Sequence, residues 1–301
     1  MFTAGPATAA ATARRHALSA GSILLAVGDS LAAGYQPTDG HRPPPIDPAT
    51  GMPDAGYPGG YAADIARAKH LRLIDLGCPG ETTLSYVSRP AQKACASGYE
   101  ELTHTSNQQA AALAELAAHK GQVSLVTFDL GMNDLDGCLH NESVSLSCLG
   151  GRATALARRL PRLIGTLKAA LQRDDPGAVM VAMTYYDPFL AQAYRPGGLK
   201  GDALAALSLS AASGLDATLS ALYRHLGLLV APVGSAFRLG TVLPLRTYGG
   251  KTLPTDVAQV CTLTWMCPLP GATRGANVHP NTHGYAVIAD EFERALARAG
   301  D

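Results

Sequence analysis

The sequence predicts a three-layer α/β/α sandwich with a flavodoxin-like parallel sheet of about five strands. Short apolar runs alternate along the chain with longer amphipathic stretches, which is the pattern of repeated βαβ units. Hydrophobic residues make up 47% of the 301 positions, enough for a sizeable core. Neither an internal repeat nor a linker divides the chain. We therefore expect one domain over residues 22–301, with helices on both faces of the sheet.

The predicted strands are short apolar runs bounded by turn residues. The first run, Ile23–Val27, ends at Gly28. The other four are expected at residues 71–76, 123–130, 178–185 and 228–233.

The predicted helices lie between these strands and after the last one. The clearest helical period covers residues 152–172, where six apolar residues share one stripe: Leu156, Leu160, Leu163, Ile164, Leu167 and Leu171. Further helices are expected at 60–70, 107–119, 203–225 and 283–299. We expect Asn107 or Ser106 to be the N-cap of the helix at 107–119.

Three segments are expected to be irregular. Residues 35–58 contain seven prolines and form a loop. Residues 234–278 form a long irregular stretch, which we expect to wrap the active-site face. Residues 1–21 are rich in alanine and threonine and lack the apolar run of a signal peptide. We interpret them as a disordered leader or the remnant of a secretion segment.

The charge composition excludes several classes of protein. Lysine and arginine total 24 and aspartate and glutamate total 24, so the basic excess of a nucleic-acid-binding protein is missing. Charged residues are only 16%, which argues against disorder. We find no apolar stretch approaching 18 residues and expect no membrane span. A nucleotide-binding protein is disfavoured because no glycine-rich phosphate loop follows the first strand.

The six cysteines fall into three local pairs in segments expected to be loops. We expect the disulfides Cys78–Cys95, Cys138–Cys148 and Cys261–Cys267. The alternative is six reduced thiols in a cytosolic protein. Disulfides imply an oxidising compartment, so the pairing predicts a secreted, extracellular protein whose signal peptide is absent from this chain.

Four polar segments lie where a doubly wound sheet places its active site, at the carboxyl ends of strands. The first three follow strands one, two and three: Gly28-Asp29-Ser30-Leu31, Gly77 to Thr82, and Gly131-Met132-Asn133-Asp134. The fourth is Val278-His279-Pro280-Asn281, before the last helix. Each segment alone is more often an ordinary turn; together they point to acyl transfer.

The residue types fit that chemistry. A serine hydroxyl needs an adjacent base, and His279 can take the proton of Ser30 and return it to the leaving group. An oxyanion needs donors, which the backbone N–H groups of Ser30 and Gly80 and the side-chain amide of Asn133 can supply. Asp29 is interpreted as structural, bonding local backbone amides.

These four blocks resemble the SGNH (GDSL) hydrolase superfamily, which is named for a Ser, Gly, Asn and His in this order. The matching residues are Ser30, Gly80, Asn133 and His279. The resemblance implies a flavodoxin-like sheet and ester hydrolysis with neither metal nor cofactor. The three local cysteine pairs look like those of the secreted bacterial lipase and esterase branch.

One position departs from the family pattern, which often has Asp three residues before the histidine. Here that position is Ala276, and Asn277 follows it. The His279 ring could be oriented by a backbone carbonyl in a working dyad, by the Asn277 amide, or by an acid from elsewhere. We expect the dyad.

The sequence thus predicts a carboxylic-ester hydrolase that forms an acyl-enzyme on Ser30. Its partner would be a small-molecule or lipid ester; we expect no nucleic acid, no stable membrane insertion and a monomer. The alternatives are a carbohydrate deacetylase of the same family and a catalytically silent binding module. Tyr185 and Tyr186 either line the pocket or pack in the core, and Trp265 either shapes an acyl pocket or covers the core.

Overall fold

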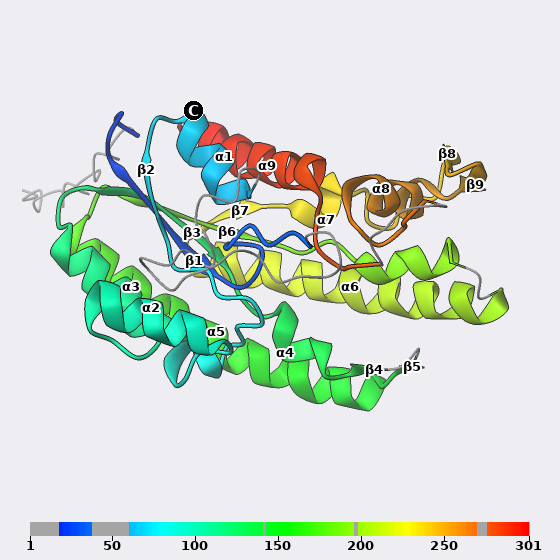
Figure 1. Ribbon diagram of the computed structural model, residues 1–301, viewed down its shortest axis with the longest axis horizontal. Coiled ribbons are helices and arrows are strands. Elements are labelled where there is room, and N and C mark those ends of the chain that lie inside the picture. Colours follow the sequence, from blue (N-terminus) through cyan, green and yellow to red (C-terminus); the bar gives the residue numbers. More distant parts are fainter. Residues whose placement is uncertain (1–17, 38–59, 141–142, 196–197, 270–275, 301) are drawn as a thin grey trace, which may run out of the picture.

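A computed structural model describes residues 18–37, 60–140, 143–195, 198–269 and 276–300 (Figure 1). Of the expected leader, residues 1–17 lie outside the described part. Most of the proline-rich loop also lies outside it, since residues 38–59 are not described.

The central sheet has five parallel strands in the order β2-β1-β3-β6-β7. In chain order this is the second, first, third, fourth and fifth strand, which confirms the predicted flavodoxin-like sheet. β1 and β3 are interior strands, and every residue in both is buried. The bounds are Ile23–Gly28 for β1, Arg72–Asp75 for β2, Val123–Asp129 for β3, Val179–Met183 for β6 and Leu229–Ala231 for β7.

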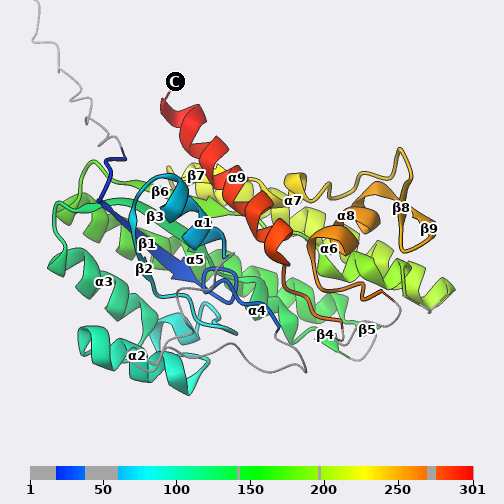
Figure 2. The ribbon, with the colours of Figure 1, turned by 45° about the horizontal axis from the view of Figure 1, so that its top comes forward.

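Helices cover both faces of the sheet, as Figures 1 and 2 show. α1 (Tyr61–Ala68) and α9 (Thr282–Gly300) pack together on one face, where the rings of Tyr61 and Phe292 stack with centroids 4.8 Å apart. The other face carries α3 (Gln108–Ala118), α5 (Leu146–Asp174) and α6 (Leu199–His225). The predicted three-layer sandwich is therefore correct.

The two longest helices start earlier than the sequence pattern indicated. α5 begins at Leu146 because Ser145 caps it, with its side chain accepting a hydrogen bond from the backbone N–H of Cys148. α6 begins at Leu199, directly after Gly198. In both views the N-terminal halves of these helices extend past the carboxyl ends of the strands (Figures 1 and 2).

One expectation about apolar stretches needs correcting. By length and composition alone, α6 could cross a bilayer. Alanines and serines separate the leucines of α6, so no continuous apolar run stands out in its sequence. In the fold, α6 lies beside β7, and a single helix of this kind is weak evidence for a membrane span.

The expectation of an irregular stretch over residues 234–278 is also wrong in part. This stretch contains the end of α7 (Val233–Ala236), a hairpin of β8 (Arg246–Tyr248) and β9 (Lys251–Leu253), and α8 (Thr255–Leu263). The hairpin turns at Gly249 and Gly250, whose φ angles of 55° and 76° suit glycine. Strands of three residues are too short to show a period of two.

Several small elements were not predicted because they are too short or too polar to show a period. They are η2 (Ser85–Val87), α2 (Lys93–Thr103), α4 (Met132–Asp136), β4 (Leu139–His140), β5 (Ser143–Val144) and η3 (Pro188–Ala193). Two of them, α4 and η3, line the site described next.

Candidate active site

Ser30 and His279 lie side by side although 249 positions separate them in the chain. Ser30 follows the interior strand β1, and His279 lies in the loop before α9. Nε2 of the imidazole is 2.8 Å from Oγ of the serine. This is hydrogen-bond distance, so the ring is placed to accept the hydroxyl proton.

The other ring nitrogen of His279 faces the side chain of Asn277. Nδ1 lies 2.7 Å from Oδ1 of Asn277, and the same oxygen accepts the backbone N–H of His279 at 3.0 Å. An oxygen at Nδ1 favours the tautomer with its proton on Nδ1, which leaves Nε2 free to accept from Ser30. The expected dyad with a backbone partner is therefore not what the structure shows. An Asx turn places the amide oxygen there from only two residues away.

The histidine loop is held by two contacts that the sequence did not indicate. The hydroxyl of Tyr186 donates to the carbonyl of Val278 at 2.7 Å. The backbone of Trp265 pairs with the loop in both directions: its N–H donates to the His279 carbonyl at 3.1 Å, and its carbonyl accepts the Asn277 N–H at 3.0 Å. Trp265 thus acts on the loop through its backbone.

The loop Gly28–Leu31, which carries Ser30, is held in place by Asp129, the last residue of β3. The backbone N–H of Asp29 donates to both the carbonyl and Oδ1 of Asp129, at 3.1 and 2.8 Å. A Cβ added to Gly28 would lie 1.5 Å from Oδ1 of Asp129, so only glycine fits there. Oδ1 of Asp29 accepts the N–H of Leu31 at 2.9 Å, a local structural contact. Together these bonds fix the backbone on both sides of Ser30.

Gly80, in the loop after β2, and Asn133, in the short helix α4, line the same pocket as Ser30. Gly80 has a φ of 81°, a backbone conformation that favours glycine. Within the described residues, the backbone N–H groups of Ser30 and Gly80 have no hydrogen-bond acceptor. The side-chain amide of Asn133 donates to the carbonyl of Glu81 at 3.0 Å.

Asp134 of α4 links this helix to the loop after β2, a role that the sequence pattern did not indicate. Its carboxylate accepts the backbone N–H of Thr83 at 2.7 Å and the Thr83 hydroxyl at 2.5 Å. Arg159 of α5 lies 3.5 Å from the same carboxylate. Together with the hydrogen bond between Asn133 and Glu81, these bonds hold the loop after β2 against α4. Asp134 adjoins Asn133 in sequence, but its partner Thr83 lies 51 positions away.

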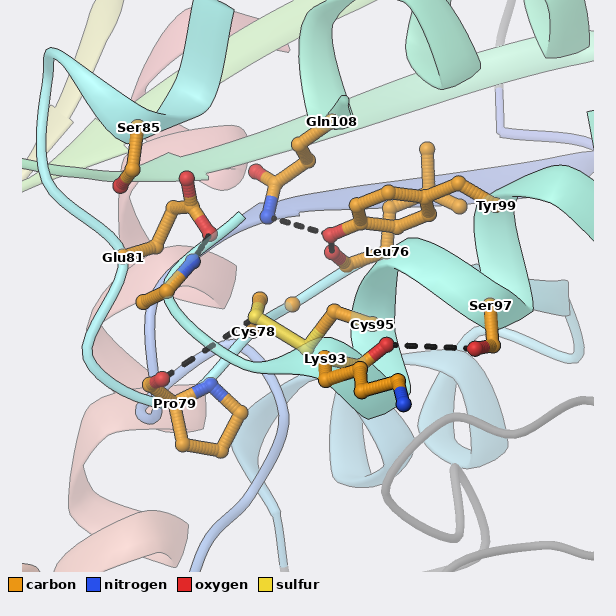
Figure 3. Close-up of a disulfide and its surroundings, with 12 residues drawn as sticks. Leu76, Cys78, Pro79, Glu81, Ser85, Lys93, Cys95, Ser97, Tyr99 and Gln108 are labelled. Carbon is orange, nitrogen blue, oxygen red and sulfur yellow. Dashed lines mark hydrogen bonds between the residues drawn. A yellow bond between two sulfur atoms is a disulfide. The ribbon is translucent and has the colours of Figure 1, made fainter. Parts of the chain in front are cut away.

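The loop after β2, which contains Gly80, is also held by the disulfide between Cys78 and Cys95, shown in Figure 3. Cys78 directly precedes Pro79 and Gly80, and Cys95 lies in α2. Nearby, the buried hydroxyl of Tyr99 donates to the Leu76 carbonyl at 2.7 Å. The other two disulfides in the structure, Cys138–Cys148 and Cys261–Cys267, join the remaining cysteines in the expected pairs.

These loops enclose a pocket of about 290 Å³. Four tyrosine and phenylalanine side chains, Tyr35, Tyr185, Tyr186 and Phe189, contribute to its wall. The ring of Tyr35 lies 4.3 Å from the His279 ring, centroid to centroid. Tyr186 therefore both lines the pocket and supports the histidine loop.

Burial changes the proton affinity of the groups around the pocket. It lowers the pKa of His279 to about 4, because an imidazolium is costly away from water. It raises the pKa values of Asp29 and Glu81 to about 7 for the same reason, since their charged forms lose hydration. At neutral pH the His279 ring is thus neutral, the state that a general base requires.

Comparisons with known proteins support the fold. The structure is similar to that of phospholipase A1 from Streptomyces albidoflavus NA297, with a TM-score of 0.51 and 17% identity over 93% of this chain and 99% of that chain. It is also similar to an extracellular lipase from Streptomyces rimosus, with a TM-score of 0.54 and 17% identity over 91% of this chain and 99% of that chain. At these identities the likeness shows the fold alone. None of the curated proteins matches this chain.

The sequence pattern of the GDSL-like lipase/acylhydrolase family matches residues 26–287, which include all four blocks around the pocket. The chain belongs to the GDSL-like lipase/acylhydrolase family.

Proposed function

We propose that this protein hydrolyses carboxylic esters through an acyl-enzyme on Ser30. The observation that carries the proposal is the relay Ser30–His279–Asn277, with successive distances of 2.8 and 2.7 Å. Family membership supports an esterase or lipase type of enzyme. The arrangement argues against a silent binding module, because such a module has no need to aim a neutral imidazole at a serine.

In the proposed reaction, Nε2 of His279 takes the proton of Ser30 as Oγ attacks the ester carbonyl carbon. The negative charge that develops on the carbonyl oxygen is stabilised by the N–H groups of Ser30 and Gly80 and the amide of Asn133. His279 then gives its proton to the departing alcohol. Water, activated by the same ring, attacks the acyl-enzyme and releases the acid.

A panel of p-nitrophenyl esters of increasing chain length, run on wild type and Ser30→Ala, tests this proposal. We expect turnover by wild type and loss of turnover in the variant. A fluorophosphonate probe should label Ser30 in the folded protein. Absence of both turnover and label would favour the binding module.

Hydrolysis of acetyl groups on a carbohydrate is a second candidate. Tyr35, Tyr186 and Phe189 in the pocket wall favour it, because aromatic faces can stack against sugar rings. Release of acetate from an acetylated polysaccharide, at a higher kcat/KM than for any p-nitrophenyl ester, would select this candidate.

We also propose that the protein is secreted and monomeric. All six cysteines form disulfides in the structure, which is compatible with an oxidising compartment. Thiol titration of protein made by its natural route should find no free thiol. Six reactive thiols would overturn the proposal of secretion.

A further inference from the structure

The chain turns back on itself directly after Ser30, and this turn returns Tyr35 to the site. Gly34 has a φ of 66°, which glycine adopts without strain. The N–H of Ala33 donates to the Asp29 carbonyl at 3.2 Å, and the N–H of Tyr35 donates to the Ser30 carbonyl at 2.9 Å. As a result, the side chain of Tyr35 lines the same pocket as Ser30.

The backbone of Tyr35 is also held by α9, the helix that begins at Thr282 shortly after His279. The hydroxyl of the fully buried Tyr285 donates to the Tyr35 carbonyl at 2.7 Å. The same hydroxyl lies 3.5 Å from the Ser30 carbonyl. Tyr35 is therefore bonded both to the turn that carries Ser30 and to the helix that follows His279.

The ring of Tyr35 lies against the imidazole of His279. Their centroids are 4.3 Å apart and their planes are inclined by 45°. The two nitrogens on the edge of the imidazole already face Ser30 and Asn277, at 2.8 and 2.7 Å. The tyrosine ring packs over a face of the imidazole, because rings placed edge to edge in one plane would hold their centroids farther apart.

The hydroxyl of Tyr35 takes no part in this arrangement. Within the described residues it has no hydrogen-bond partner, and burial is the cause that raises its pKa. The contact with His279 is thus made by the ring, which phenylalanine also has.

A contact on the face of the imidazole matters here because Asn277 is uncharged. A carboxylate in that position would hold Nδ1 with a charge-assisted hydrogen bond once the ring is protonated, and such bonds are roughly twice as strong as neutral ones. The amide oxygen of Asn277 holds the ring less firmly against rotation out of line with Ser30. A second ring packed on the face of the imidazole opposes that rotation.

We propose that Tyr35 is a positioning residue, whose ring keeps the imidazole of His279 aligned with Ser30 and Asn277 and excludes water from one of its faces. This inference rests on the proposed function, since alignment and neutrality of the ring matter for a general base. Tyr35 acts through His279 and takes no proton itself.

Removing the tyrosine ring has two opposing effects on the pKa of His279. Water that reaches the exposed face stabilises the imidazolium and raises the pKa. Loss of the electron-rich tyrosine face lowers it, by less than about one unit for a partly exposed cation. Burial has brought the pKa of His279 from 6.5 to about 4, so hydration is the larger effect. We therefore expect the pKa to rise.

The other titratable groups of the pocket do not change charge in the range where His279 does. Those that line it, besides Tyr35 and His279, are Asp29, Tyr185 and Tyr186. Burial raises the pKa of Asp29 to about 7 and those of both tyrosines far above their ordinary range. His283 of α9 is exposed and does not line the pocket. A midpoint between pH 4 and 6 therefore reports on His279.

The first test measures kcat and KM for p-nitrophenyl acetate between pH 3.5 and 8. In Tyr35→Ala we expect kcat at pH 6 to fall about tenfold, a part of the 10²–10⁴-fold that a positioned base contributes. The midpoint of the acid limb should rise by about one pH unit. Tyr35→Phe should restore the wild-type rate and midpoint, because it keeps the ring.

Tyr248→Ala is the matched control. Tyr248 of β8 is also partly buried and packs edge-on against another tyrosine, Tyr194, with centroids 5.4 Å apart, but it does not line the pocket. This variant should keep the wild-type midpoint. An unchanged midpoint in Tyr35→Ala, or a rise in KM with kcat unchanged, would overturn the inference. A shifted midpoint in Tyr35→Phe would also overturn it, because the hydroxyl would then be the active part.

The second test needs no turnover. The Cε1–H signal of His279, assigned by its loss in His279→Gln, is titrated by NMR in a Ser30→Ala background with and without Tyr35→Ala. We expect the midpoint to be about one pH unit higher without the tyrosine ring. Equal midpoints would overturn the inference. Absence of ester turnover by wild type, together with a shifted NMR midpoint, would instead refute the proposed function and leave the effect of Tyr35 on the imidazole standing.

Discussion

Oδ1 of Asn277 contacts His279 at two points, accepting the backbone N–H at 3.0 Å and facing Nδ1 of the ring at 2.7 Å. One amide oxygen thus orients both the backbone and the imidazole of the base. The arrangement supplies the partner that Ala276 cannot, and it does so without a buried negative charge. This has consequences for the proton affinity of the base and for the effect of substitutions.

Replacing Asn277 should change the acid limb of the activity profile. In Asn277→Asp, a carboxylate beside Nδ1 would stabilise the imidazolium and raise the pKa of His279, so the fall in kcat/KM should begin at a higher pH. In Asn277→Ala, the ring loses its partner and kcat should fall by about 10²-fold. Thr166→Ala serves as the control for activity, because the exposed Thr166 hydroxyl bonds the Arg162 carbonyl in its own helix and does not line the pocket. A wild-type kcat in Asn277→Ala would show that another group orients the ring.

The pH dependence of kcat/KM reports on His279 in the free enzyme. The ordinary pKa of histidine, near 6.5, would make activity fall between pH 7 and 6. Burial lowers the pKa of His279 to about 4, so the ring stays neutral and active down to about that pH. We expect activity to persist at pH 5.5 and to be lost as the pH falls through 4. A midpoint near 6.5 would mean that the ring is better hydrated than the structure shows.

Removal of the nucleophile should abolish ester turnover and leave the fold intact. Ser30→Ala keeps the backbone bonds of Asp29 and Leu31, so circular dichroism and the melting temperature should match wild type. Ser97→Ala, on the exposed face of α2, is the matched control and should keep full activity. Turnover near the wild-type rate in Ser30→Ala would refute the nucleophile assignment.

The proposed oxyanion donors predict losses in kcat with little change in KM. Asn133→Ala should lower kcat by about 10²–10³-fold, the usual cost of one lost donor. Gly80→Ala should also lower kcat, because its φ of 81° strains alanine and shifts the N–H. Gly21→Ala provides a control with the same strain, since Gly21 has a φ of 84° and lies far from the pocket. Equal activity of the two glycine variants would argue against a role for Gly80.

The disulfide Cys78–Cys95, next to the loop that contains Gly80, should affect both stability and catalysis. Cys78 and Cys95 are 17 positions apart, and removing such a crosslink costs roughly 3 kcal/mol of unfolding free energy in the chain-entropy model. We expect Cys78→Ser/Cys95→Ser to lower both the melting temperature and kcat, because Pro79 and Gly80 directly follow Cys78. Cys138→Ser/Cys148→Ser, which opens a crosslink of 10 positions, should lower the melting temperature with a smaller effect on kcat. Similar losses of kcat in both variants would contradict a positioning role for the first disulfide.

Much of the fold could be predicted from local pattern. β1, β3 and β6 are buried apolar runs, and a buried parallel strand has no polar face to obscure its pattern. Three-residue strands such as β8 and β9 carry too little period to be recognised. The starts of α5 and α6 were missed because capping and packing, rather than propensity, decide where a helix begins.

The sequence by itself determined which residue types could carry out acyl transfer and at which strand ends they would lie. It indicated Ser30, Gly80, Asn133 and His279 because each stands where a parallel sheet brings its loops together. It left open what orients His279, since three partners were compatible with the same residues. Only the tertiary structure selected Asn277, and only it revealed that Asp134 binds Thr83 across 51 positions. The physical reason is that hydrogen bonds and cavities depend on distances of a few tenths of an ångström between distant segments, which packing sets and local sequence does not encode.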